Sequence, residues 1–324
     1  MTSRSSNRNF PDQPRLIFMG TPEFAVPSLK ALIEQGKNIV SVVTQPDRPK
    51  GRGKKLAATP VKQMALENGI EVLQPDKASD ASFCERIERR APDLIVVVAF
   101  GQILKKRLLN IPKWGVVNVH ASLLPKYRGA APIQTAIMNE DDKTGLTVMR
   151  MEEGLDTGPI LLQEECSILK DETAGHLHDR LALKAGNLMI KWLNQMADDL
   201  IQERPQDHAA ASYAPKIEKS LSLIDWKQPA SKVSALIRAL DPKPGAYTTW
   251  QDKRIKLFAS GVAEKENRDV TPGKVVSQGE EGLIVETGQG VIKISEMQYP
   301  GKKRLPAKDC LRGISLPEGT ILGR

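Results

Sequence analysis

The stretch that decides the fold and the chemistry is Val117-Asn118-Val119-His120-Ala121-Ser122-Leu123-Leu124-Pro125. The apolar run over residues 115–119 predicts a strand, in which side chains two residues apart point to the same face. Asn118 and His120 are therefore expected on one face, where the strand ends. An amide that donates to an oxyanion and an imidazole that moves a proton suit attack on a carbonyl carbon. The same pair can also cap loop backbone groups, and the spacing alone leaves both interpretations open.

Short apolar runs alternate with segments of helical spacing on the N-terminal side of this stretch. Strands are predicted at 15–19, 39–44 and 94–99, and helices at 60–68 and 79–90. A further helix is expected to begin with Thr21 as its N-cap and Pro22 as its first residue. This alternation predicts a Rossmann-like, mostly parallel sheet with helices on both faces, an α/β fold. The first turn has one Gly and a Pro instead of a Gly-rich fingerprint, which argues against a nicotinamide cofactor.

The pattern changes on the C-terminal side. Strands at 146–151 and 160–168 and a long helix at 173–196 precede a polar segment without apolar periodicity. Short strands with Gly-rich turns then predict a smaller OB-like β-barrel domain, a fold that often carries nucleic acid but can also be a packing domain without a ligand. The predicted parts are an N-terminal extension (1–14), a catalytic domain (15–204), a linker (205–220) and the β-barrel domain (221–324).

Composition narrows the class of protein. A chain of 324 residues with 40% hydrophobic content can form two cores. It has no apolar run long enough to cross a bilayer and no signal-peptide core near its start, so we expect a cytoplasmic protein. Cys84, Cys166 and Cys310 are far apart and in no metal-binding spacing, which predicts reduced structural thiols and no metal cofactor.

The charge favours a polyanionic partner. The net charge is +8, of which +5 falls on residues 206–324 and +3 on the longer N-terminal part. Residues 46–55 hold five cations and one Asp among two Gly and two Pro, which predicts an exposed basic loop outside regular structure. Such a loop can neutralise phosphates or contact an unpaired base, although many basic loops are only solvated. Its cations are Arg48, Lys50, Arg52, Lys54 and Lys55.

A candidate carboxylate stands between two predicted strands. Gly154 and Gly158 flank Asp156 and let the backbone turn sharply around it. A carboxylate close to an imidazole can orient that ring and take part in proton exchange, so Asp156 is a candidate acid–base residue. Considered alone, an Asp in such a turn more often caps its own backbone.

Taken together, these residues resemble those of the folate-dependent formyltransferases, in which Asn-x-His followed by Ser-Leu-Leu-Pro, and a later Gly-Leu-Asp-Thr-Gly, form the active site. Within that family the chain is most similar to the members that act on an aminoacylated initiator tRNA. The similarity runs from the segment Phe18-Met19-Gly20-Thr21-Pro22-Glu23-Phe24 through the basic loop to the C-terminal β-domain. It covers roughly residues 15–320, and residues 1–14 lie outside it.

The resemblance implies catalytic roles for Asn118, His120 and Asp156. It implies tetrahydrofolate contacts for Ser122, Leu123, Leu124 and Pro125, and entry of the basic loop, with Arg52 prominent, into the acceptor end of initiator tRNA. The implied reaction moves the formyl group of 10-formyltetrahydrofolate to the α-amine of methionyl initiator tRNA, through direct attack and a tetrahedral intermediate. It requires no metal. A monomer is expected, and Phe100-Gly101-Gln102-Ile103-Leu104 is expected to line the pterin pocket.

Two alternatives remain open at this point. One is a formyltransferase that acts on a small amine, such as glycinamide ribonucleotide or an amino-sugar nucleotide. The basic loop and the additional 119 residues after position 205 argue against it. The other is a non-catalytic RNA-binding protein on the same fold, which has no physical need for Asn118, His120 and Asp156 together.

Overall fold

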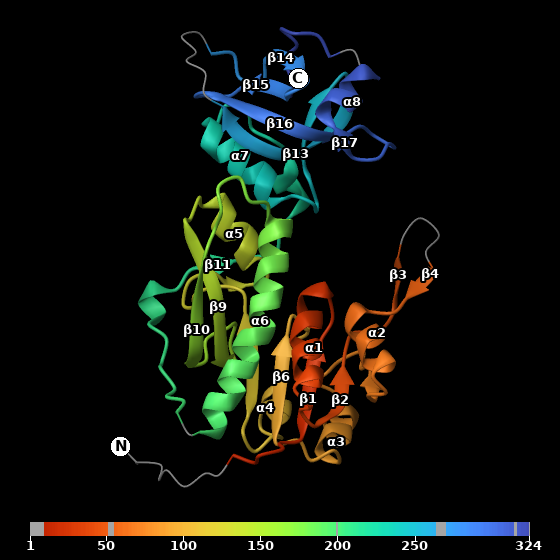
Figure 1. The fold of residues 1–324 in the computed structure, drawn as a ribbon, viewed down its shortest axis with the longest axis vertical. Helices are drawn as coiled ribbons and strands as arrows, with labels where there is room; N and C mark the ends of the chain where they lie inside the picture. The colour runs from red at the N-terminus through yellow and green to blue at the C-terminus, as the bar shows by residue number, and fades with distance from the viewer. Residues whose placement is uncertain (1–9, 51–54, 199, 264–269, 314–315, 324) are drawn as a thin grey trace. The chain divides into compact units, whose positions relative to one another are not determined.

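The computed structural model (Figure 1) describes residues 10–50, 55–198, 200–263, 270–313 and 316–323. The chain divides into two compact units that interleave along the sequence. The first unit holds Met1–Gly129, Gly145–Cys166 and Asp179–Tyr213, and the second holds Ala130–Thr144, Ser167–His178 and Ala214–Arg324. This division follows which segments pack together. The predicted end of the catalytic domain at residue 204 and the predicted start of the tRNA-binding domain at residue 221 concern function, and they stay predictions.

The first unit is built on a seven-stranded sheet in the order β10-β9-β7-β6-β1-β2-β5. Its strands are β1 (Leu16–Gly20), β2 (Ile39–Val43), β5 (Val72–Leu73), β6 (Leu94–Val98), β7 (Val116–His120), β9 (Lys143–Arg150) and β10 (Ile160–Ser167). β7, β6, β1, β2 and β5 pair in parallel, whereas β9 pairs with β7 in the antiparallel sense. The predicted mostly parallel sheet is therefore confirmed.

Helices accompany these strands, as the alternation in the sequence predicts. They are η1 (Glu23–Ala25), α1 (Val26–Glu34), α2 (Pro60–Glu67), α3 (Ala81–Glu88), α4 (Lys106–Leu109) and the long α6 (Ala174–Ala197). Figure 1 shows β6, β1 and β2 side by side with α1 beside them. Ile17 and Met19 of β1 and Ile95 and Val97 of β6 are in one buried cluster with Phe83 of α3. Burial of such side chains holds the parallel strands, and hence the carboxyl ends that carry the site, in place.

The first helix begins differently from the prediction. Pro22, and not Thr21, is the N-cap residue of η1, and no side chain caps that end. The Thr21 hydroxyl instead donates to the Phe100 carbonyl oxygen at 2.9 Å. Thr21 therefore ties the first turn to the loop after β6, a long-range contact that local sequence cannot reveal.

The basic loop also differs from its prediction, because part of it is regular. Arg48–Lys50 (β3) and Lys55–Ala57 (β4) pair as a short antiparallel hairpin. Pro49 does not prevent this, since a two-stranded ribbon has free edges on which Pro is tolerated.

The second unit contains a six-stranded sheet in the order β12-β13-β16-β15-β14, with β17 beside β16. Its elements are α5 (Pro132–Met138), η3 (Lys219–Ser222), α7 (Ala230–Ala239), β12 (Ala246–Trp250), β13 (Lys253–Ala263), β14 (Val275–Gly279), β15 (Gly282–Glu286), β16 (Val291–Gln298), β17 (Leu305–Pro306) and α8 (Ala307–Arg312). The pairings between these strands are antiparallel, as expected for a small β-domain. Trp226 and Ile237 lie in its core, where α7 packs against β13 and β16. Helix α5, which packs against α7, was not predicted from the sequence.

The predicted linker is partly structured. It contains η2 (His208–Ala210) and β11 (Tyr213–Ala214), which pairs with β8 (Arg128–Gly129). Gln206 is buried, and the preceding Arg204 forms a β-bridge with Ile160. Hydrogen bonds thus hold part of this segment, and its role as a linker between the two predicted domains stays a prediction.

Candidate active site

Strand β7 places the two polar residues of the opening stretch. It lies between β6 and β9, with Asn118 paired to Val97 and Met149 and His120 paired to Thr147. Since the two residues are two apart in one strand, they share a face, as predicted. His120 is buried and Asn118 is half-buried. Within the described part of the chain no side-chain hydrogen bond engages the Asn118 amide, so it is available to a ligand.

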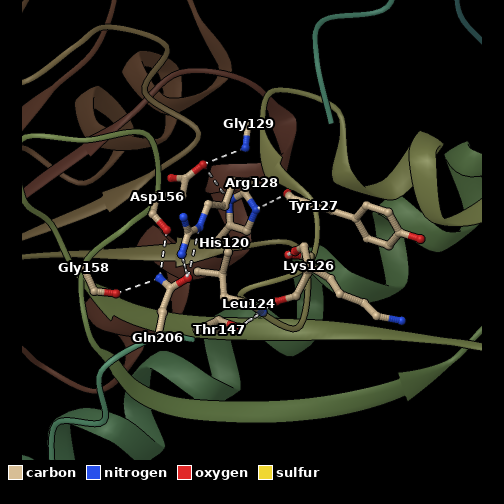
Figure 2. A network of polar contacts seen from close by, with 11 residues as sticks. His120, Leu124, Lys126, Tyr127, Arg128, Gly129, Thr147, Asp156, Gly158 and Gln206 are labelled. Carbon is tan, nitrogen blue, oxygen red and sulfur yellow. Dashed lines mark hydrogen bonds and ion pairs between the residues drawn. The ribbon is translucent and has the colours of Figure 1, made fainter. Parts of the chain in front are cut away.

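The His120 ring is fixed by the loop that follows it. Its Nε2 atom lies 2.9 Å from the Tyr127 carbonyl oxygen, and its Nδ1 atom lies 3.7 Å from Asp156 Oδ2 (Figure 2). A carbonyl oxygen only accepts, so Nε2 must carry hydrogen and donate. Nδ1 is then the ring nitrogen that can gain or lose a proton. The structure therefore brings His120 and Asp156 together with the proton-accepting nitrogen on the carboxylate side.

Asp156 lies in the turn between β9 and β10 and is held on its carboxylate side. The Gly129 N–H donates to Asp156 Oδ2 at 2.8 Å (Figure 2). Asp156 itself has a left-handed backbone with φ 52°, which is costly for a residue with a side chain. Gly158 is required for a different reason, because a Cβ atom there would lie 2.0 Å from the Arg150 carbonyl oxygen. The sharp turn thus comes from Asp156, and the adjacent close approach comes from Gly158.

The turn at residues 122–125 is closed by a hydrogen bond from its first residue, Ser122. Ser122 is fully buried, and its hydroxyl donates to the Lys126 carbonyl oxygen at 2.6 Å. Thr147 Oγ1 donates to the Ser122 carbonyl oxygen and accepts from the Leu124 N–H, at 2.7 and 3.1 Å. The Ser122 hydroxyl hydrogen is therefore committed to the turn, and the folate contact expected for this residue stays a prediction.

The three residues that follow Ser122 differ in exposure. Leu124 is buried against Met149 and Ile160, whereas Leu123 and Pro125 are half-buried. In the neighbouring loop after β6, Phe100 and Leu104 are buried, but Ile103 is 86% exposed. An exposed apolar side chain beside a polar site is a candidate ligand contact.

Two further side chains of the site were not predicted from the sequence. Arg128 is 2% exposed, and its Nε and Nη2 donate to Gln206 Oε1 at 3.1 and 2.7 Å. Gln206 Nε2 donates to the carbonyl oxygens of Asp156 and Gly158 at 2.8 and 2.7 Å (Figure 2). No local signal identifies Gln206, because it falls in a polar segment 50 positions beyond Asp156. For Arg128 the only signal in the sequence is a cation shortly after a buried apolar strand.

The base of the basic loop is anchored by its single acid. The Asp47 carboxylate accepts from Lys62 Nζ and from Gln74 Nε2, both at 2.7 Å, and these hydrogen bonds lower the pKa of Asp47. Arg48 Nη2 donates to Gln45 Oε1 at 3.0 Å. The cation paired with Asp47 is therefore Lys62 of α2, which lies outside the loop.

The loop cations are described to different extents. Arg48 is described in full, and Lys50 and Lys55 are described as backbone positions of β3 and β4. Arg52 and Lys54 lie outside the described residues. Their predicted role therefore stays a prediction from the sequence.

Basic clusters in the second unit are not all free for a ligand. Arg304 forms a two-point ion pair with the buried carboxylate of Asp241, with N–O distances of 2.6 and 3.1 Å, and stacks over Phe258. The Arg304 guanidinium is thus engaged by charge-assisted hydrogen bonds within its own unit. Lys302 and Lys303 are the exposed cations of that cluster.

Other features bear on the class of site. Across the part of the chain that the structure describes, no group of three His, Cys, Asp or Glu side chains is arranged to hold a metal. The three cysteines are buried and form no disulfide. No described helix is long and apolar enough to span a bilayer.

A cavity of about 920 Å³ lies at the opposite end of β7, beside Trp114, Arg150 and Trp192, and it contains none of the candidate catalytic residues.

The chain matches a known protein family along most of its length. The family model described as formyl transferase matches residues 14–193, and a formyl transferase C-terminal domain model matches residues 216–315. A methionyl-tRNA formyltransferase of Geobacter metallireducens is 48% identical over 308 residues, which are 95% of this chain and 98% of that protein. One from Acetivibrio thermocellus is 44% identical over 310 residues, 96% of this chain and 100% of that protein.

Solved structures share the fold at lower identity. HypX from Aquifex aeolicus, in complex with tetrahydrofolic acid, has a TM-score of 0.62 at 20% identity, and the match covers 93% of this chain and 47% of that chain. WlaRD, a sugar 3N-formyl transferase solved with dTDP and 5-N-formyl-THF, has a TM-score of 0.65 at 20% identity. That match covers 90% of this chain and 100% of the other.

The His120 geometry predicts the tautomer of the neutral ring. In the neutral ring we expect hydrogen on Nε2 and none on Nδ1, because the Tyr127 carbonyl oxygen can only accept from Nε2. Long-range nitrogen–proton NMR spectra of the four histidines, with His120→Gln to assign the signal, measure this directly. An Nδ1-protonated neutral ring for His120 would show that the Tyr127 bond is absent in solution.

Proposed function

This chain belongs to the formyltransferase family, together with the methionyl-tRNA formyltransferases, and we propose from this that it formylates methionyl initiator tRNA to supply N-formylmethionyl-tRNA for translation initiation. The donor is 10-formyltetrahydrofolate and the acceptor is the free α-amine of the aminoacyl group. The observation that carries the proposal is the match to a methionyl-tRNA formyltransferase over 95% of this chain. The structure of this chain is consistent with it, since His120 Nδ1 lies 3.7 Å from Asp156 Oδ2. No metal takes part in this scheme.

The catalytic roles follow from which atoms can donate and accept. The neutral amine attacks the formyl carbon and gives a tetrahedral intermediate that carries an oxyanion and a cationic amine. The Asn118 amide and a protonated His120 donate to the oxyanion, which lowers the barrier most where water is excluded. His120 takes its proton on Nδ1, since Nε2 is engaged with Tyr127.

Asp156 completes the proton path. Its carboxylate lies beside Nδ1, so it stabilises the imidazolium and, directly or through an ordered water, accepts the amine proton. The oxyanion then re-forms the carbonyl as the bond to the folate nitrogen breaks, and the proton that Asp156 took from the amine passes to that nitrogen, directly or through the same water. The attack is direct, and no covalent formyl-enzyme is formed.

The folate site is proposed on two neighbouring loops. Leu123, Leu124 and Pro125 offer the apolar and backbone surface after β7, with Ser122 closing the turn that presents them. Ile103, in the loop after β6, offers an exposed apolar side chain for the pterin. Both loops follow the carboxyl ends of adjacent parallel strands, where open α/β sheets bind ligands.

The tRNA site is proposed on the basic loop and the C-terminal region. Arg48, Lys50, Arg52, Lys54 and Lys55 would contact the acceptor end, and residues 221–324 would act as a tRNA-binding domain joined by residues 205–220 to a catalytic domain at 15–204. Residues 1–14 carry no inferred role. We further propose that the protein is a monomer. We also propose that it acts in the cytoplasm, because charged tRNA and reduced folate are both available in that compartment.

An acceptor comparison tests the activity. Purified protein with 10-formyltetrahydrofolate should formylate methionyl initiator tRNA with a kcat/KM at least about 10²-fold above that for glycinamide ribonucleotide or an amino-sugar nucleotide. Methionyl elongator tRNA is the matched control for discrimination between tRNAs. A preference for either small amine would replace this proposal with its alternative, and transfer to neither class of acceptor would contradict both.

Substitution of the catalytic candidates should separate chemistry from binding. His120→Ala and Asp156→Ala should each lower kcat by roughly 10²- to 10⁴-fold, because each removes a proton-transfer or oxyanion group. The KM for tRNA should change by only about twofold, since neither side chain belongs to the proposed tRNA surface. Steady-state formylation kinetics provide the measurement, with Glu34→Ala at the exposed end of α1 as an acidic control. Near-normal turnover in both variants would contradict the assignment.

Substitution of the basic loop should have the opposite signature. Arg52→Ala with Lys54→Ala should raise the KM for tRNA and leave folate binding unchanged, because two cations near phosphates are lost. The slope of log affinity against log salt should become shallower by about two units at most. Binding titrations at several salt concentrations check this, with Lys30→Ala and Lys37→Ala on the first unit as the control. An unchanged slope would remove the loop from the tRNA site.

A further inference from the structure

The segment Arg204–Ser212, which we name the strap, contacts both loops of the proposed active site. Arg204 exchanges two backbone hydrogen bonds with Ile160, at 2.8 and 2.9 Å, at the end of the loop that carries Asp156. At its other end, Ser212 accepts from the Tyr127 N–H through Oγ at 3.0 Å and from the N–H of the next residue through its carbonyl oxygen at 2.8 Å. Tyr127 is also the residue whose carbonyl holds His120. The strap therefore joins the support of His120 to the support of Asp156.

Gln206 lies near the middle of the strap with all of its hydrogen-bonding capacity in use. Its two N–H groups donate to the carbonyl oxygens of Asp156 and Gly158, and its Oε1 accepts two bonds from Arg128 (Figure 2). A rotated amide would place its oxygen against two carbonyl oxygens, so only one orientation is satisfied. A buried amide with this many fixed partners holds its neighbours rigidly.

Arg128 explains why the amide is held so firmly. It is almost fully buried, and among the described residues it forms no ion pair with a carboxylate. Its side-chain partners are Gln206 Oε1 and His208 Nδ1, the latter at 3.2 Å from Nη2. A buried cation is costly unless it is well hydrogen-bonded, and a charged donor polarises the amide that accepts from it. The polarised amide then donates more strongly to the Asp156 and Gly158 carbonyl oxygens.

Asp156 is consequently held at two places. Its carboxylate accepts from the N–H of Gly129, the residue next to Arg128, and its carbonyl accepts from Gln206, the partner of Arg128. Between these two points the Asp156 backbone has a left-handed φ of 52°, an uncommon conformation that Asp tolerates better than most residues. Without the Gln206 bond the turn is free to relax, and the carboxylate would move away from Nδ1 of His120.

We propose that Gln206, oriented by Arg128, is a positioning residue that sets the place of the Asp156 carboxylate opposite His120. This inference rests on the proposed function, because Asp156 must matter for turnover before its placement can. Gln206 itself touches no reacting atom. Its role is to fix the main chain of the catalytic turn from a segment that is remote in sequence.

Two substitutions test this placement. Gln206→Glu keeps an oxygen for Arg128 but replaces the two N–H donors with an oxygen that repels both carbonyls, and Gln206→Met removes both sets of bonds at similar volume. Each should lower single-turnover formylation of methionyl initiator tRNA by about tenfold to 10²-fold, since small displacements of catalytic groups have effects of this size. The KM for tRNA and for 10-formyltetrahydrofolate should stay within about twofold. Gln195→Glu and Gln195→Met, on the half-buried surface of α6, are the matched controls and should leave the rate unchanged.

A double-mutant cycle separates positioning from general stability. In an Asp156→Ala background, adding Gln206→Met should leave the residual rate unchanged, because Gln206 acts through the Asp156 carboxylate. A further loss in that background, parallel to a fall in melting temperature, would overturn the proposal and make Gln206 only a structural residue. Rates are normalised to the fraction that is folded by circular dichroism, so a destabilised variant still gives an answer.

The same cycle separates failure of the proposed catalytic role of Asp156 from failure of the positioning role of Gln206. If Asp156→Ala alone leaves turnover near normal, the proposed catalytic role fails, and the positioning role fails with it. If Asp156→Ala abolishes most turnover but Gln206→Glu and Gln206→Met do not reduce it, only the positioning role fails. Loss in the single variants of both residues, with no further loss in the double variant, supports both roles.

Discussion

The imidazole of His120 donates its Nε2 hydrogen to the Tyr127 carbonyl oxygen, and this single bond decides how the rest of the site can work. It leaves Nδ1 as the nitrogen that can take up a proton in the proposed reaction, and Nδ1 is the nitrogen that faces Asp156. A ring held the other way would present a fixed donor to the carboxylate and no proton acceptor to the substrate. The position of the Tyr127 carbonyl oxygen therefore sets which ring nitrogen of His120 carries the hydrogen in the neutral form.

Tyr127 and Asp156 reach the site from separate loops, so the fold has to bring these loops together. β7 delivers His120 at its last residue, and the chain then returns through a turn closed by Ser122 and Thr147. Asp156 arrives from the connection between β9 and β10, and β9 lies next to β7 in the sheet. The strap ties the two loops with hydrogen bonds. Such bonds fix direction as well as distance, which a proton-transfer site requires.

Local pattern in the sequence predicted part of this arrangement, and contacts between distant segments account for the rest. Asn118 and His120 follow from the two-residue period of a strand, and the parallel sheet follows from alternating apolar runs. Asp156 was identified from its flanking glycines, although Asp156 itself adopts the left-handed backbone. Thr21 has the composition of an N-cap, but its hydroxyl binds the Phe100 carbonyl, 79 positions away. Gln206 could not be predicted, because it lies in a polar run and periodicity reveals only apolar positions. Its place in the site depends on the direction of its hydrogen bonds to the Asp156 and Gly158 carbonyl oxygens.

The length of the chain is a weaker guide to the acceptor than its charge. A sugar 3N-formyl transferase shares this fold over 90% of the chain, so a region after residue 205 does not by itself distinguish a tRNA acceptor from a small one. The distribution of charge distinguishes them better. Asp47, the one acid of the basic loop, is bound by Lys62 and Gln74, whose hydrogen bonds lower its pKa. With five cations and this one acid, residues 46–55 suit a polyanionic acceptor, which a small amine acceptor would not need.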